Sequence, residues 1–186
     1  KRVVVSFFGD GALHEGVFWE SLNFACLKKL PILFICEDND LAIHSRMEER
    51  VGHKNITEVI SGFYCNIDKA ETTDVYKIYQ ITKKMLTRMK KTDLPGFLYF
   101  KYYRYLEHVG INEDFDAGYR SRKEFLQWLK KDPVKMQRQR LLKLGMEESK
   151  ISAIEKETDK KIEMSIKKAQ KAKFPKKSEA FANVYA

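Results

Sequence analysis

The first forty residues alternate between apolar runs and a stretch with helical spacing. Residues 3–8, in which Ser6 is the one polar residue, and residues 32–36 are apolar runs without alternation and with β-branched side chains, a pattern typical of buried strands. Residues 15–27, between them, place Phe18, Leu22, Ala25 and Cys26 on one side of a helix. A strand, a helix and a strand with short connections predict a right-handed crossover and parallel pairing of the two strands.

The middle of the chain continues this order. Residues 56–61 predict a short helix, and residues 64–67 a third strand. A longer helix, capped by Thr73 or Asp74, extends to residue 89, and residues 97–103 form a fourth strand whose buried face the alternation does not decide. The buried stripe predicted for the longer helix consists of Val75, Ile78, Ile81, Met85 and Met89.

Beyond residue 118 the pattern is helical throughout. Ser121 and Asp132 are N-cap candidates for two helices, and residues 147–173 predict a long third helix with an isoleucine stripe. We therefore predict an α/β fold, with a mainly parallel sheet flanked by helices over residues 1–118. A C-terminal helical extension, residues 119–186, then packs on this core or on a partner subunit.

Charge and composition narrow the possible functions. The net charge is +9, and residues 119–177 hold 19 Lys and Arg against 8 Asp and Glu. No DNA- or RNA-binding motif accompanies this basic region, and its acidic residues are interleaved at helical spacing, so a solvated helical face is the simpler interpretation. An acidic protein partner, such as the carrier domain of a larger complex, is the alternative.

Membrane insertion and secretion are not expected. No apolar stretch approaches the roughly 20 residues that span a bilayer. The first residues lack the apolar core and cleavage site of a signal peptide. The three cysteines lack C-x-x-C spacing, which suits reduced thiols, so we expect a cytoplasmic protein.

Polar side chains follow the predicted strands at one edge of the sheet. Asp10 comes directly after the first strand, within Gly9-Asp10-Gly11, and Asn39 follows the second. Arg104 follows the fourth, so three strand ends converge where open α/β sheets bind ligands. Carboxylate and amide oxygens suit Mg²⁺, which in turn binds phosphate oxygens, and glycines let a backbone approach a phosphate closely. The pattern predicts a site for Mg²⁺ and a diphosphate.

The whole stretch from residue 3 to Asn39 resembles the thiamine diphosphate (ThDP) motif of 2-oxo acid dehydrogenase alpha subunits, of the pyruvate, branched-chain and acetoin types. The resemblance implies that Asp10, Asn39 and the backbone carbonyl of Leu41 bind Mg²⁺. It also implies that the backbone around Gly9, Gly11 and Ala12 faces the diphosphate. Glu15 either caps the first helix or contacts the cofactor.

Later segments extend the resemblance. Tyr103-Arg104-Tyr105 with His108 is similar to the family's Tyr-Arg-Tyr-x-x-His loop, in which the Arg contacts the diphosphate and the His reaches the reacting thiazolium. His108 is therefore the candidate catalytic residue. Here Glu107 precedes this His and Val109 follows it, and the serine phosphorylated in some members is absent. The segment from Tyr119-Arg120 to Glu124, the later Asp-Pro pair and residues 183–186 also resemble the family.

The implied function is ThDP- and Mg²⁺-dependent oxidative decarboxylation of a 2-oxo acid, with acyl transfer to a lipoyl carrier. The implied partners are a beta subunit, in an α₂β₂ heterotetramer, and a lipoyl acyltransferase. We expect the chain to be the C-terminal portion of a longer subunit and to be inactive alone. A transketolase-like lyase or carboligase is the alternative enzyme, and a helical scaffold without catalysis is the non-enzymatic alternative.

Overall fold

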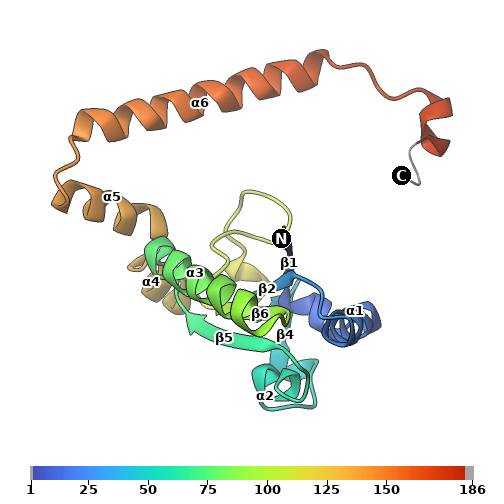
Figure 1. The fold of residues 1–186 in the computed structure, drawn as a ribbon. Coiled ribbons are helices and arrows are strands. Elements are labelled where there is room, and N and C mark those ends of the chain that lie inside the picture. Colours follow the sequence, from blue (N-terminus) through green and yellow to red (C-terminus); the bar gives the residue numbers. More distant parts are fainter. Residues whose placement is uncertain (1, 183–186) are drawn as a thin grey trace. The chain divides into compact units, whose positions relative to one another are not determined.

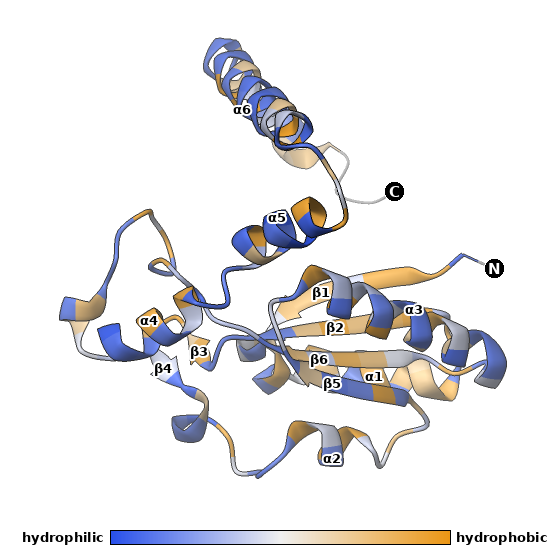
Figure 2. Cartoon of the chain, turned by 90° about the vertical axis from the view of Figure 1, so that its left-hand side faces the viewer, coloured by the Kyte–Doolittle hydropathy of each residue, from blue (hydrophilic) through white to orange (hydrophobic). Residues whose placement is uncertain are grey.

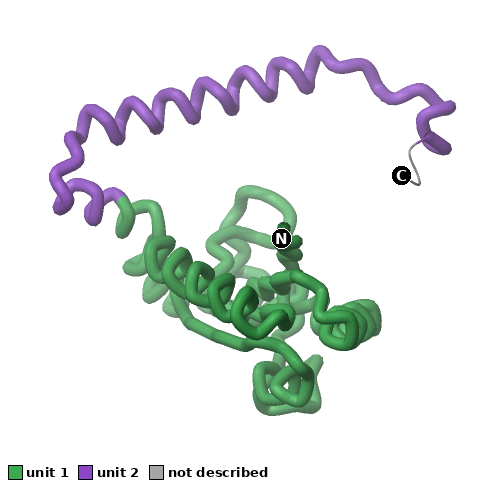
Figure 3. Tube along the Cα trace, in the orientation of Figure 1, with its two compact units in different colours: residues 1–137 green, residues 138–186 purple. Residues whose placement is uncertain are grey.

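The computed structural model describes residues 2–182, so the predicted family ending at residues 183–186 lies outside the described residues. The chain forms two compact units, residues 1–137 and 138–186, which are coloured separately in Figure 3. The division falls between Gln137 and Arg138 rather than after residue 118. The helix after residue 121 belongs with the first unit because its Phe125 is buried and its Trp128 carbonyl accepts a hydrogen bond from the Tyr105 hydroxyl at 3.1 Å.

A four-stranded parallel sheet forms the centre of the first unit (Figure 1). The strand order is β1-β2-β6-β5, which confirms the predicted parallel sheet and places three of the four strand ends side by side. The strands are β1 (Val4–Gly9), β2 (Ile32–Asp38), β5 (Asn66–Glu71) and β6 (Gly96–Lys101).

The burial of the strands follows their place in this order. The central strand β6 buries every residue from Gly96 to Phe100, which is why its alternation does not reveal a single buried face. The edge strand β5 starts two residues later than predicted and carries charged residues, which Figure 2 shows as a hydrophilic stretch. The burial predicted for β1 is wrong: Val4 is 62% and Phe7 65% exposed, because β1 is the opposite edge and has one neighbour among the described strands.

Helices cover both faces of the sheet. The helices α1 (Gly16–Leu27) and α2 (Ile56–Ile60) pack against one face, where Phe18, Leu22 and Phe97 share a core cluster. The helix α3 (Val75–Thr92) packs against the other face through Met85 and Met89. These layers confirm the predicted α/β class.

The long helix α3 begins where the sequence indicates. The Asp74 carboxylate accepts hydrogen bonds from the backbone N–H groups of Tyr76 and Lys77, at 2.9 and 3.3 Å, and so satisfies two donors of the first turn. Its predicted stripe is only partly buried: Val75 is 49% exposed because it lies outside both core clusters.

Short elements connect the strand ends and complete the first unit. They are η1 (Asp10–His14), β3 (Leu41–Ala42), β4 (Ser45–Arg46), η2 (Met47–Glu49), η3 (Phe115–Ala117) and α4 (Arg122–Leu129). The helix α5 (Pro133–Lys143) contains the boundary between the two units.

The second unit is built around the helix α6 (Glu148–Lys171), followed by η4 (Lys177–Phe181). Arg138 pairs with Glu148 and Glu155, which links the start of this unit to α6. The predicted isoleucine stripe is buried only at Ile151; the other isoleucines of α6 are more than half exposed. Among the described residues, no helix combines the length and apolarity needed to cross a membrane.

Gly96 offers a test of how tightly β6 is packed. A Cβ atom at this position would lie 2.7 Å from the Met89 sulfur and 3.0 Å from a Leu33 methyl group. We predict that Gly96→Ala lowers the free energy of unfolding by about 1–3 kcal/mol, the usual cost of overpacking a core. Urea denaturation followed by tryptophan fluorescence measures the change. Gly52→Ala is the control, since nothing lies within 4 Å of its added Cβ; equal effects of the two substitutions would contradict the packing described here.

Candidate functional site

The loops that follow β1, β2 and β6 meet at the carboxyl edge of the sheet. Asp10 begins η1 directly after β1, and Asn39 follows β2. Arg104 follows β6, and its guanidinium donates a hydrogen bond to the carbonyl of Ile43, in the loop after β2, at 3.0 Å. The structure therefore brings the three sequence-predicted segments together at one edge.

Asp10 is a buried carboxylate balanced by a cation. Its side chain is 1% exposed, and its Oδ2 accepts a hydrogen bond from Nη2 of Arg50 at 2.5 Å. The Arg50 guanidinium also lies 3.0 Å from Nδ1 of His14. Partial burial and the nearby Arg50 charge lower the pKa of His14. Arg50 was not found by sequence reasoning, and the only available signal is the rule that a buried carboxylate needs a cationic partner.

Gly11 is where the loop after β1 contacts the loop after β2. A Cβ atom at Gly11 would lie 3.2 Å from the Cβ of Ala42, in β3. The glycine therefore has a packing role here in addition to any approach to a phosphate. Gly9 ends β1, and the carbonyl of Ala12 accepts the backbone N–H of Glu15 at 3.2 Å.

The loop after β2 is folded by its own polar side chains. The Asn39 side-chain oxygen accepts the backbone N–H of Leu41 at 3.1 Å, and its amide group donates to the Tyr102 hydroxyl at 3.3 Å. Asp40 has a left-handed backbone with φ of 68°, and its N–H donates to the Asp38 carboxylate at 2.7 Å. These bonds hold Asn39 and the buried Leu41 against each other.

Asp38 anchors this loop to the core of the sheet. Its side chain is 1% exposed, and one carboxylate oxygen accepts a hydrogen bond from the Tyr99 hydroxyl of β6. Burial raises the pKa of the Asp38 carboxyl group, and burial together with this hydrogen bond raises the pKa of Tyr99. The pair was not identified from sequence, because Asp38 and Tyr99 are far apart in the chain.

The Arg104 side chain is held by several acceptors. Besides Ile43, its guanidinium donates to the Leu106 carbonyl at 3.1 Å and to the Tyr119 hydroxyl at 2.8 Å. Burial, followed by the neighbouring charge of Arg120, lowers the pKa of Arg104. His108 is exposed, and its Nδ1 lies 3.5 Å from the same guanidinium. The two predicted residues of this loop are therefore adjacent.

A buried ion pair supports the loop from behind. Arg120 is 5% exposed, and its Nε donates to the Asp114 carboxylate at 2.6 Å. The same guanidinium donates to the Arg104 carbonyl and lies over the ring of Phe115, with 5.2 Å between the guanidinium carbon and the ring centre. Arg120 lies in the segment from Tyr119 to Glu124 that resembles the family, but its supporting role is apparent only from the contacts.

The structure shows which contacts two glutamates near the site make. Glu15 is the N-cap residue of α1, although its side chain makes no capping hydrogen bond. Glu107 accepts hydrogen bonds from the backbone and side-chain amides of Asn112, at 3.1 and 2.9 Å. It closes the turn in which Gly110 has a φ of 139°, a conformation that glycine adopts without strain.

The donor set fits a hard divalent cation with few protein ligands. No group of three or more His, Cys, Asp or Glu side chains that could hold a metal occurs among the described residues. Mg²⁺ usually takes one or two carboxylates together with phosphate and water oxygens. Asp10 is a buried carboxylate that already binds a cation, and Asn39 adds an amide oxygen on the adjacent strand end.

Comparison with known proteins identifies the family of this chain. A profile of the Dehydrogenase E1 component family matches residues 1–178. The chain is 30% identical, over its full length, to the 2-oxoisovalerate dehydrogenase subunit alpha of Mus musculus mitochondria. It is 29% identical, over 99% of its length, to the chloroplastic pyruvate dehydrogenase E1 component subunit alpha-3 of Arabidopsis thaliana. A solved transketolase of Pichia stipitis is 22% identical with a TM-score of 0.48, over 54% of this chain and 15% of that one.

The chain belongs to the Dehydrogenase E1 component family. Its curated relatives are alpha subunits of 2-oxo acid dehydrogenases, which confirms the resemblance stated from the sequence. The chain spans 42% of the length of these two relatives.

The contact between Arg50 and Asp10 can be tested without any ligand. In chelator-containing buffer, Arg50→Gln leaves a buried carboxylate without its cation, and we predict a loss of about 3–5 kcal/mol in the free energy of unfolding. The control is Arg122→Gln, whose pair with Glu113 spans 3.6 Å and whose side chain is 69% exposed; we expect its loss to stay below about 1 kcal/mol. Urea denaturation compares the two, and a similar small loss in both would show that Asp10 does not depend on Arg50.

Proposed function

We propose that this chain provides the diphosphate- and Mg²⁺-binding part of a ThDP-dependent 2-oxo acid dehydrogenase alpha subunit. The observation that carries the proposal is the buried Asp10 carboxylate, paired with a cation at the strand edge that it shares with Asn39 and Arg104. Membership of the Dehydrogenase E1 component family supports it.

In this proposal Asp10, Asn39 and the Leu41 carbonyl hold Mg²⁺. Asp10 would exchange its Arg50 partner for Mg²⁺ in the loaded protein, because one buried carboxylate does not need both cations. The hydrogen bond from Leu41 to the Asn39 side chain keeps these two residues in one turn, so their oxygens are positioned before the metal arrives. Such preorganisation reduces the ordering cost of binding.

The backbone around Gly9, Gly11 and Ala12, together with the Arg104 side chain, would hold the diphosphate. A guanidinium suits this role because its planar set of N–H groups matches phosphate oxygens. The present acceptors of Arg104, two carbonyls and the Tyr119 hydroxyl, hold the side chain at the strand edge. Glu15 is exposed beside this backbone, and its side chain makes no capping hydrogen bond, so we propose that it contacts the cofactor.

ThDP, when bound, supplies a carbanion that adds to the 2-oxo carbon and accepts charge as CO₂ leaves. The residues of this chain orient the diphosphate and move protons. His108 is the proposed proton carrier, because it is exposed, adjacent to Arg104, and has an imidazole, the group that most often transfers protons in enzymes. Arg120 and Asp114 act behind it by fixing the Arg104 backbone.

The proposed partners are a beta subunit, in an α₂β₂ assembly, and a lipoyl carrier that accepts the acyl group. The named relatives act on 2-oxoisovalerate or pyruvate, so an oxo acid of this size is the proposed substrate class. An acetoin dehydrogenase is the second candidate within the same chemistry. A cytoplasmic location remains a prediction from the sequence.

Asp10→Asn tests the proposal directly. The substitution keeps the side-chain size but removes the only carboxylate among the proposed ligands, so we predict loss of Mg²⁺-dependent ThDP binding. Calorimetric titration of the chain assembled with its beta subunit measures this. Asp68→Asn is the control, because Asp68 lies half-way along the edge strand β5 and is partly exposed. Unchanged ThDP affinity in Asp10→Asn would refute the assignment; loss in both variants would point to a general structural effect.

A further inference from the structure

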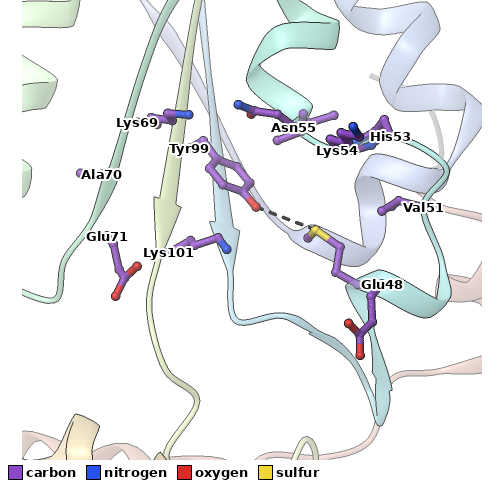
Figure 4. Close-up of a pocket in the computed structure, with 12 residues that line it drawn as sticks. Glu48, Val51, His53, Lys54, Asn55, Lys69, Ala70, Glu71, Tyr99 and Lys101 are labelled. Atoms are coloured by element: carbon purple, nitrogen blue, oxygen red, sulfur yellow. Dashed lines mark hydrogen bonds between the residues drawn. The ribbon is translucent and has the colours of Figure 1, made fainter.

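A cavity opens at the carboxyl ends of β5 and β6, and none of the proposed cofactor residues lines it. It has a volume of about 660 Å³, which is in the range of small-molecule sites. Tyr99 and Lys101 lie on its sheet side, and Glu48 and Val51 on the opposite side (Figure 4). The whole cavity lies within the first compact unit.

The register of β5 and β6 explains why a cavity forms here. Ile67 pairs with Phe97, and both pack in the core cluster that α1 and α2 cover. The next pair on the same face is Lys69 with Tyr99, followed by Glu71 with Lys101. The face therefore changes from apolar and covered to charged and open toward the carboxyl edge, where η2 and the segment before α2 form the other wall.

The floor of the cavity is apolar. Tyr99 is 7% and Ile56 3% exposed, so their surfaces belong to the core as well as to the cavity. The Met47 sulfur lies 4.0 Å from the Tyr99 hydroxyl, and Val51 also faces this space. Such a floor favours a ligand with a short hydrocarbon group, because burying it releases water from apolar surface.

The rim of the cavity is cationic. Lys54, Lys69 and Lys101 line it, and among the described residues none of their ammonium groups forms an ion pair or hydrogen bond. Two carboxylates, from Glu48 and Glu71, also line it. Three ammonium groups against two carboxylates leave an excess of one positive charge, which balances a monoanion better than a phosphate dianion or a polyphosphate.

The imidazole of His53 adds a polar group to the same wall. Its Nδ1 atom is buried and has no hydrogen-bond partner among the described residues. A buried polar atom without a partner is costly, and a bound carboxylate could accept a hydrogen bond from it.

We propose that this cavity binds a small monocarboxylate with a short apolar chain. The carboxylate lies among Lys54, Lys69 and Lys101, and the hydrocarbon group lies on Tyr99, Ile56 and Met47. The site is separate from the proposed cofactor site, because none of the residues proposed to hold Mg²⁺ or ThDP lines the cavity.

Methionine-methyl NMR tests this with butyrate as the probe. The full chain, labelled with ¹³C at its methionine methyl groups and free of ThDP and Mg²⁺, is titrated with butyrate. We expect a saturable shift of the Met47 signal, while Met85, which is 1% exposed in the core under α3, stays unchanged. Butanol, which has the same chain without the charge, and inorganic phosphate are titrated in parallel and should produce no saturable shift.

Lysine variants locate the carboxylate. We expect Lys69→Gln and Lys101→Gln each to raise the dissociation constant about tenfold, the effect of losing one charge-assisted contact. Lys84→Gln, an exposed lysine on α3 outside the cavity, should leave it unchanged. An unaltered Met85 signal shows that a variant is folded. No saturable Met47 shift, equal shifts with butanol, tighter binding of phosphate, or equal affinity in all three variants would each overturn the proposal. Because the samples hold no cofactor, these outcomes do not depend on the proposed function.

Discussion

The burial of the Asp10 charge is the constraint on which the site depends. An ionised carboxylate that is 1% exposed is costly to bury without a partner, and the chain supplies the Arg50 guanidinium. Arg50 follows β4 and pairs with Asp10 in the loop after β1. The same guanidinium also donates a hydrogen bond to the Asp40 carbonyl, in the loop after β2, at 3.5 Å. One side chain therefore joins the two loops that contain the proposed metal ligands. The same position suits Mg²⁺, since either cation balances the same charge.

Two further buried contacts fix the strand ends around Asp10. Tyr99 of β6 donates to Asp38 at the end of β2, so adjacent strands are joined where the loops begin. Arg120 binds the carbonyl of Arg104 and the carboxylate of Asp114, which gives the loop after β6 a fixed base. The first contact fixes the residue that precedes Asn39, and the second fixes the backbone of Arg104 itself. The candidate site is thus supported by residues outside the proposed set of ligand and contact residues.

The sequence predicted most of the fold because its signals are local. Asp74 and Ser121 cap their helices as expected, and the runs at residues 3–8 and 32–36 form adjacent parallel strands. The errors concern packing. Val4 and Phe7 are exposed because β1 is an edge strand, and an apolar run does not reveal its neighbours. The candidate site residues were predicted from motifs, whereas the contacts of Arg50, Asp38 and Tyr99 join distant segments and could not be predicted in this way.

The central claim is that the position now held by Arg50 at Asp10 is a metal site. Crystals of the chain with its beta subunit, ThDP and Mn²⁺ in place of Mg²⁺ test it through the anomalous signal of the metal. We predict one peak in each alpha chain, at about 2.1 Å from oxygens of Asp10 and Asn39, the distance expected for an octahedral divalent ion. We also predict that the Arg50 guanidinium has moved away from Asp10. A peak elsewhere, or an Arg50 guanidinium still bound to Asp10 in the loaded complex, would contradict it.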